Sequence, residues 1–160
     1  MTFEELLKRK GRENFDSDQT ILCLDPGHTT GVALFKTSAL HSCEQVSTIV
    51  EDKKGHRLLW THLDDLFERT QPDVVVCEDY RVYQQKLESH AFSPVLTLRL
   101  IGAIDYICHT KGIPITYQMA TTAKGFCTDK KLQDWDYWQS GLKHSRDAIR
   151  HGCYYLLFHK

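Results

Sequence analysis

The stretch from Ile21 to Phe35, ILCLDPGHTTGVALF, holds two apolar segments joined by a polar turn. Apolar runs of this length bounded by Pro and Gly are typical of β-strands, so we expect a buried strand at 20–25 and its hairpin partner at 31–36. The turn contains one carboxylate, Asp25, together with two glycines and a Thr-Thr pair. Two chemistries suit this design: a loop whose backbone N–H groups hold a phosphate, or a strand-end aspartate that binds a divalent metal.

The composition of the chain is that of an ordinary globular domain: 160 residues, of which 41% are hydrophobic and 26% charged. A chain of this length builds one core, so we expect an N-terminal helix and linker at 1–19 and a single domain at 20–160. The net charge of −1 argues against bulk electrostatic coating of nucleic acid but allows a local basic groove. No apolar run approaches the roughly 18–20 residues of a membrane span, so we expect no membrane partner.

The six cysteines indicate a reduced, cytoplasmic protein. They form no Cys-x-x-Cys pair, and several lie in apolar segments, where a free cysteine behaves as a small hydrophobe. A structural zinc site is therefore not expected.

The rest of the pattern predicts an α/β fold. Expected strands span residues 20–25, 31–36, 41–50, 73–77 and 113–117, and expected helices span 2–10, 56–69, 94–110 and 144–158. No regular structure is expected at 51–55 or 119–140. A hairpin-led meander followed by strand–helix alternation implies a mixed five-stranded sheet, an antiparallel three-stranded meander plus two parallel strands, flanked by helices.

Three acidic residues lie at the edges of expected core elements. Asp25 closes the first strand, Glu78 closes the central strand, and Asp147 lies in the first turn of the last helix. Asp147 faces the same way as His144, since residues three apart share a helix face. If the first and central strands are neighbours, Asp25 and Glu78 repel each other unless a positive group lies between them. A hard divalent cation suits such ligands, and two cations would stabilise the attacking and leaving oxygens of a phosphoryl displacement.

Each of these residues also has an ordinary structural interpretation. Asp25 before Pro-Gly is a common turn, and Glu78 could simply end a strand in a polar side chain. Asp147 could stabilise a helix N-terminus through the macrodipole, and His144 could be a surface residue of the same helix. Their combination, in this order and on these elements, favours a shared site.

Four segments resemble the RuvC-type Holliday junction resolvases of the ribonuclease H-like superfamily, especially the compact versions carried by bacteriophages. ILCLDPGHTTGVALF resembles the family's first strand and hairpin with its D-P-G-x-x-x-G signature, and VVVCEDY resembles the strand that ends in a metal-binding glutamate. LTLRLIGAIDYIC resembles the helix that follows, and LKHSRDAIRHG resembles the closing helix with its H-x-x-D pair. The resemblance covers residues 20–158 and implies a ribonuclease H-like fold.

The resemblance also implies a function. The implied active-site and metal-binding set is Asp25, Glu78, His144 and Asp147, with Mg²⁺ or Mn²⁺ as cofactor, two ions per site. The implied enzyme is a homodimeric crossover junction endodeoxyribonuclease that makes paired incisions in four-way DNA junctions, leaves 5′-phosphates, and would work in the bacterial host cytoplasm if phage-encoded. We expect Asp25 to bridge the ions, with Glu78 holding one and Asp147 the other. His144 is expected either to bind metal or to position or deprotonate the attacking water.

Basic and aromatic residues around the acidic site are candidates for DNA contacts. AKGFCTDKK is shorter than the family's basic segment, so Lys124 matches its first lysine and Lys130 or Lys131 its second. Members of the family insert an aromatic side chain into the junction. Here the matching position holds Arg81 instead, and Tyr80 and Tyr83 lie on either side of it. The expected phosphate track consists of Lys124, Lys130, Lys131, Lys143, Arg146 and Arg150. Any one of these could instead be a solvated surface charge.

Two apolar or aromatic groups have open interpretations. Trp135, Tyr137 and Trp138 could stack on bases or pin their loop to the core, and we expect at least one tryptophan to pack. The 94–110 helix carries a stripe that is either a dimer seam or ordinary core packing. That stripe consists of Leu96, Leu100, Ile104 and Ile107.

The opening turn is expected to border the DNA. Its glycines should let the chain pass close to the acidic cluster, because glycine carries no Cβ. His28, Thr29 and Thr30 are expected to face the DNA backbone.

Other functions fit parts of the pattern. The same fold could serve a branched-DNA or flap endonuclease, or an RNase H-type enzyme, since selectivity lies in dimer geometry and loops. D-P-G-x-T-T-G-x-A also resembles the first phosphate loop of actin-like sugar kinases and ATPases, but that architecture needs two such domains and a second phosphate loop. A non-catalytic junction-binding protein would have no use for an intact acidic set. Glu78 and the H-x-x-D helix therefore favour metal binding at Asp25.

Overall fold

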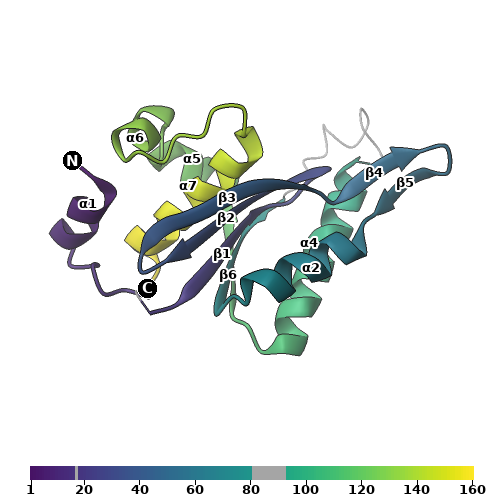
Figure 1. Cartoon of the computed structure of the whole chain (residues 1–160), viewed down its shortest axis with the longest axis horizontal. Coiled ribbons are helices and arrows are strands. Elements are labelled where there is room, and N and C mark those ends of the chain that lie inside the picture. The colour runs from purple at the N-terminus through teal and green to yellow at the C-terminus, as the bar shows by residue number, and fades with distance from the viewer. Residues whose placement is uncertain (17, 81–92) are drawn as a thin grey trace.

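A five-stranded mixed sheet in the order β3-β2-β1-β6-β7 forms the centre of the molecule (Figure 1). The computed structural model describes residues 1–16, 18–80 and 93–160. The strands of this sheet are β1 (Thr20–Asp25), β2 (Thr29–Lys36), β3 (Ala39–Ser47), β6 (Val74–Asp79) and β7 (Ile115–Met119). β2 is antiparallel to β1 and β3, whereas β6 is parallel to β1 and β7. The predicted α/β fold, a three-stranded meander plus two parallel strands, is confirmed.

Helices cover both faces of the sheet. They are α1 (Phe3–Arg9), α2 (Trp60–Thr70), α4 (Ser93–Lys111), α5 (Ala120–Phe126), α6 (Asp129–Asp134) and α7 (Lys143–Phe158). Alternate residues of β1 point to opposite faces: Ile21 and Cys23 pack with α1, α6 and α7, and Leu22 and Leu24 pack with α2 and α4. β1 is buried on both sides, which explains its unbroken apolar run. None of the described helices combines the length and apolarity that crossing a bilayer requires.

A second, two-stranded sheet follows β3 and was missed by the sequence prediction. β4 (Ile49–Asp52) and β5 (Gly55–Leu58) pair antiparallel across a turn in which the Lys54 N–H donates to Asp52 Oδ1 over 2.8 Å. Gly55 has a φ of +96°, a value that favours glycine. The predicted strand at 41–50, loop at 51–55 and helix from residue 56 were therefore wrong in extent. The apolar residues of 58–59 fit the helical spacing of α2 although they precede that helix.

α5 and α6 occupy part of segment 119–140, where no regular structure was expected. They are seven and six residues long, less than two turns each, so a 3.6-residue repeat cannot become visible in the sequence. Thr128 caps α6 by accepting a hydrogen bond from the Lys131 N–H. Ala123 and Leu132 are fully buried, which indicates that packing stabilises these short helices.

α4 buries the apolar stripe that was a candidate dimer seam. Leu100 and Ile104 lie in the core layer between the sheet and α2, Leu96 is buried as well, and Ile107 packs at the edge of this layer. Core packing is confirmed for Leu96, Leu100 and Ile104, whereas a dimer seam on this helix stays a prediction.

α1 packs onto the layer that contains α7. A capping box begins this helix, with Thr2 and Glu5 exchanging hydrogen bonds, and Phe3 is buried. The Phe3 ring lies 5.0 Å from the Trp135 ring and 5.5 Å from the Tyr137 ring, measured between centroids. The expectation that at least one tryptophan packs is confirmed by Trp135.

Candidate active site

Two acidic residues meet at one end of the sheet because their strands are parallel neighbours. β1 and β6 pair with Leu24 opposite Cys77, so Asp25 and Glu78 follow at the next register position. Their side chains are 11% and 15% exposed. The sequence prediction placed both residues at this edge, and the structure brings them there.

α7 reaches the same edge because β2 carries a glycine at the point of contact. Gly31 lies opposite Asp25 in the β1–β2 pair. A Cβ at Gly31 would stand 1.9 Å from the carbonyl oxygen of His144, so any larger residue would push the helix away. The approach predicted for the glycines of the turn therefore holds at Gly31.

Hydrogen bonds to β3 then fix the start of α7. The His144 N–H donates to Gln45 Oε1 over 3.0 Å, and the Ser145 hydroxyl donates to the carbonyl oxygen of Glu44. In this position His144 Nδ1 lies 3.1 Å from Asp25 Oδ2. The last helix therefore enters the site with its imidazole against the central carboxylate.

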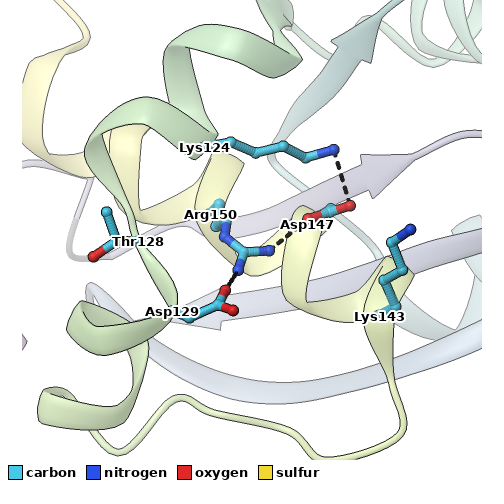
Figure 2. Close-up of a pocket in the computed structure, with 6 residues that line it drawn as sticks. All are labelled: Lys124, Thr128, Asp129, Lys143, Asp147 and Arg150. Atoms are coloured by element: carbon cyan, nitrogen blue, oxygen red, sulfur yellow. Dashed lines mark hydrogen bonds and ion pairs between the residues drawn. The ribbon is translucent and has the colours of Figure 1, made fainter.

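Asp147, one turn further along α7, is held by two basic side chains (Figure 2). Lys124 of α5 places its Nζ 3.0 Å from Asp147 Oδ2, and Arg150 Nη1 donates to Oδ1. Arg150 also binds Asp129 and donates to the carbonyl oxygen of Cys127 over 2.9 Å. Arg150 was expected in the phosphate track, but its side chain is buried and tied to these three groups. It joins α7 to the α5–α6 segment.

Glu78 is held by a residue that the sequence prediction missed. His151 is completely buried on α7, and its Nε2 lies 2.8 Å from Glu78 Oε2. Its Nδ1 lies 3.0 Å from Oε1 of Gln118 on β7. A signal did exist, because positions 144, 147 and 151 share one helix face.

The electrostatics of the site reflect crowded carboxylates. Burial, with the charges of Glu78 and Asp147, raises the pKa of Asp25 to about 6, although contact with His144 opposes the rise. Burial lowers the pKa of Lys124, but its bond to Asp147 and the charges of Glu78 and Asp25 outweigh burial and leave it raised. Lys124 therefore stays protonated and offsets part of the negative charge.

The donor set fits a hard divalent cation. Asp25, Glu78 and Asp147 supply carboxylate oxygens, which Mg²⁺ and Mn²⁺ prefer, and His144 adds an imidazole that suits Mn²⁺. The charges of Glu78 and Asp147 act with burial to raise the pKa of Asp25, and a nearby cation would oppose both effects. Across residues 1–16, 18–80 and 93–160, no three His, Cys, Asp or Glu side chains converge into a ready-made metal cage. A cation at these oxygens would compete with the Lys124 ammonium for Asp147.

The predicted DNA-contacting residues fall into different environments. Lys143 lines the pocket beside Asp147 together with Lys124. Lys130 pairs with Asp134 on the surface of α6. Lys131 donates to the Phe126 carbonyl oxygen and lies over that residue's ring.

The remaining candidates lie on other elements. Arg146 donates to the Gln139 carbonyl oxygen and stacks on Trp138. Tyr80 is half-buried directly after β6. Arg81 and Tyr83 lie outside the described residues.

The threonines of the opening turn lock its shape. Thr30 is completely buried, and its Oγ1 lies 2.6 Å from Oγ1 of Thr48. Thr48 in turn donates to the carbonyl oxygen of Gly27 over 2.7 Å. The expectation that Thr30 faces DNA is therefore wrong, because its hydroxyl is used inside the protein; His28 and Thr29 are half-buried.

Known proteins resemble this chain in structure but not detectably in sequence. No protein-family model matches the chain, and no curated protein matches it. Thermus thermophilus RuvC in complex with a Holliday junction substrate is similar with a TM-score of 0.60 at 15% identity, over 86% of this chain and 92% of that one. A further T. thermophilus RuvC structure has a TM-score of 0.58 at 16% identity, over 86% of this chain and 93% of that one. The yeast mitochondrial Holliday junction resolvase Ydc2 has a TM-score of 0.50 at 10% identity, over 97% of this chain and 91% of that one. The chain therefore has the ribonuclease H-like fold of the RuvC-type Holliday junction resolvases.

Proposed function

We propose that this protein is a metal-dependent endodeoxyribonuclease that resolves four-way (Holliday) DNA junctions by paired phosphodiester hydrolysis, leaving 5′-phosphates. The supporting observation is that Asp25, Glu78 and Asp147 lie at the same end of a resolvase-type sheet, where burial and the charges of Glu78 and Asp147 raise the pKa of Asp25. A solved neighbour, T. thermophilus RuvC, has a Holliday junction substrate bound.

The proposed cofactor is Mg²⁺ or Mn²⁺, two ions per site, held by Asp25, Glu78 and Asp147. When bound, these ions supply Lewis-acid stabilisation of the negative charge on the reacting phosphate. The protein's part is to bring carboxylates from β1, β6 and α7 to one place and to hold them there before DNA arrives.

His144 is suited to handle a proton. Its Nδ1 contacts Asp25, which orients the ring, and the side chain is 44% exposed. The other nitrogen, Nε2, can therefore accept the proton of a water that attacks the phosphate, as in general-base catalysis by carboxylate-oriented imidazoles. This arrangement favours the general-base role over direct metal ligation.

Lys124 and Lys143 are the strongest candidates for phosphate contacts. Both line the pocket beside Asp147, where positive charge would offset the charge of the scissile phosphate and its neighbours. Lys131 and Arg146 make contacts within the protein and carry less of this proposal. A homodimer would place two such sites on a substrate with two-fold symmetry.

The experiment that tests the proposed function offers the purified protein four DNA or DNA/RNA substrates with Mg²⁺ or Mn²⁺: a four-way junction, a flap, a linear duplex and an RNA/DNA hybrid. We expect cleavage of the junction by paired nicks, and a dimer mass with junction bound. Preferred cutting of flap or hybrid would instead favour another nuclease on the same fold. Equal cutting of linear duplex, or a monomer only, would contradict the resolvase assignment.

Variants of the acidic residues test the site. Asp25→Asn and Asp147→Asn should abolish cleavage while keeping junction binding in EDTA. Asp65→Asn is the matched control, because Asp65 is exposed on α2 and pairs with Arg69 one turn away. Cleavage that survives in both site variants would contradict the assignment.

A further inference from the structure

A buried histidine lies behind the acidic cluster and is not among the residues assigned to the reaction above. His151 is completely buried, and both of its ring nitrogens face side-chain oxygens, Glu78 Oε2 at 2.8 Å and Gln118 Oε1 at 3.0 Å. The three residues belong to α7, β6 and β7. The imidazole therefore ties the last helix to the two parallel strands.

The bond to Glu78 has a defined direction. A carboxylate oxygen only accepts, so His151 donates its Nε2 proton to Oε2. The Gln118 atom that faces Nδ1 is the amide oxygen, which accepts a hydrogen bond from a protonated Nδ1; with the amide turned over, its NH2 group would donate to an unprotonated Nδ1. Gln118 therefore supports the ring from the other side in either case. Glu78 thus has one oxygen fixed. Within residues 1–16, 18–80 and 93–160, no hydrogen bond to its second oxygen, Oε1, is found, so Oε1 is available for a ligand at the edge of the sheet.

Core packing alone does not require an imidazole at this position. Burying a polar group is favourable only when its hydrogen bonds are made, and an apolar side chain would fill the space without that condition. On the neighbouring position, a Cβ at Gly152 would stand 2.2 Å from the Phe35 ring, so α7 lies as close to β2 as glycine allows. The close contact brings the imidazole within reach of Glu78.

We propose that His151 is a positioning residue that holds the Glu78 carboxylate in the orientation in which its second oxygen binds the divalent cation. The inference rests on the proposed function, because only there is Glu78 assigned to metal. Residues that hydrogen-bond to a metal-binding side chain set its orientation, and their loss weakens metal affinity by about 10- to 100-fold.

Mn²⁺ binding to the protein without DNA tests this role, followed by electron paramagnetic resonance of the free ion. For His151→Leu we expect Mn²⁺ affinity to fall about 10- to 100-fold. His151→Gln should lose less, because its amide can still donate to Glu78. The Mn²⁺ affinity of Gln118→Leu should lie between those of wild type and His151→Leu, because this variant keeps the histidine but removes the side chain that supports it. If His151→Leu does not fold, the other two variants carry the test.

Two controls separate positioning from a general structural effect. In a Glu78→Gln background, His151→Leu should weaken Mn²⁺ binding no further, because the coupled residue is already lost. Tyr155→Phe breaks the 2.8 Å bond to Asp16 near the other end of α7. This variant should lower the unfolding temperature and leave Mn²⁺ affinity unchanged.

The outcomes distinguish the two proposals. Unchanged Mn²⁺ affinity in the His151 variants, or a further loss in the Glu78→Gln background, would overturn the positioning role and leave the proposed function intact. A wild-type protein that binds Mn²⁺ with the expected His151 dependence but cuts no junction would overturn the proposed function alone. A wild-type protein that binds no Mn²⁺ would contradict both.

Discussion

At the scale of single residues, the site is a balance of buried charges. Each proposed metal-binding carboxylate is in contact with a nitrogen group: Asp25 with His144, Glu78 with His151, and Asp147 with Lys124 and Arg150. The acidic residues could be found from the sequence because they end strands or start a helix. Their basic partners could not be assigned, because pairing depends on how α7 crosses the sheet.

The raised pKa of Asp25 predicts a trade between stability and function. The pKa of Asp25 is raised to about 6 in the folded protein from 3.8 in the unfolded chain. The protonated carboxyl therefore stabilises the fold fully when the pH is below the unfolded-state pKa, and this stabilisation is lost as the pH rises through the folded-state pKa. In EDTA at pH 8, Asp25→Asn should therefore be more stable than wild type by about 1–3 kcal/mol. Urea unfolding of both proteins at pH 4 and pH 8 measures this. A variant less stable than wild type at pH 8 would show that the His144 contact outweighs the repulsion.

Lys124 should compete with the divalent cation. Its Nζ lies 3.0 Å from Asp147 Oδ2, so removing the ammonium frees an oxygen and a negative charge. We expect Lys124→Gln to bind Mn²⁺ several-fold more tightly in a titration without DNA and to bind four-way junctions more weakly. Lys111→Gln is the matched control, because Lys111 pairs with exposed Glu68 and is not a candidate DNA contact. Weaker Mn²⁺ binding in Lys124→Gln would contradict this role.

At the scale of elements, the site depends on how closely α7 lies against β2. Gly31 and Gly152 are the points of closest approach, and both lack room for a Cβ. The sequence predicted β1 and β6 well, because both are apolar runs buried on two faces. It missed β4, β5, α5 and α6, because a two-residue turn and helices shorter than two turns give no readable period.

Gly31→Ala should damage both stability and metal binding. The new Cβ would meet backbone atoms of His144, which cannot rotate away, so we expect a loss of about 1–3 kcal/mol or more in unfolding free energy. Mn²⁺ affinity should fall as His144 and Asp147 move from Asp25. Gly102→Ala serves as control, because no atom of the described residues outside the backbone of α4 lies within 4 Å of its Cβ position; it should raise stability by about 0.5–1 kcal/mol. Normal Mn²⁺ binding by Gly31→Ala would show that the close contact is not needed.

At the scale of the whole molecule, the near-neutral chain concentrates its chemistry in one place. The net charge is −1, yet carboxylates and basic side chains gather where β1, β6, α5 and α7 meet. The core beneath them is rich in thiols: all six cysteines are free, and five are buried. The composition predicted the buried thiols correctly, because cysteines in apolar runs behave as core residues.

These buried thiols predict loss of stability at alkaline pH. Burial raises the pKa of Cys23, Cys77 and Cys153, and it raises the pKa of Cys108 and Cys127 to about 12. Thiols of the unfolded chain ionise near pH ~8.5. The stability that the folded protein gains by keeping its buried thiols protonated is therefore complete below that pH and falls as the pH rises above it. Urea unfolding under reducing conditions should show a decline from pH 8 to pH 10. Cys153→Ala should decline less steeply, and constant stability to pH 10 would contradict the prediction.

The most direct test of the central claim is a nicking assay on a four-way DNA junction labelled on two opposing strands, with Mg²⁺ or Mn²⁺. The account predicts paired, symmetric nicks with 5′-phosphate ends, present in wild type and absent in Asp25→Asn. Equal cutting of a linear duplex, or nicks that persist in Asp25→Asn, would contradict it.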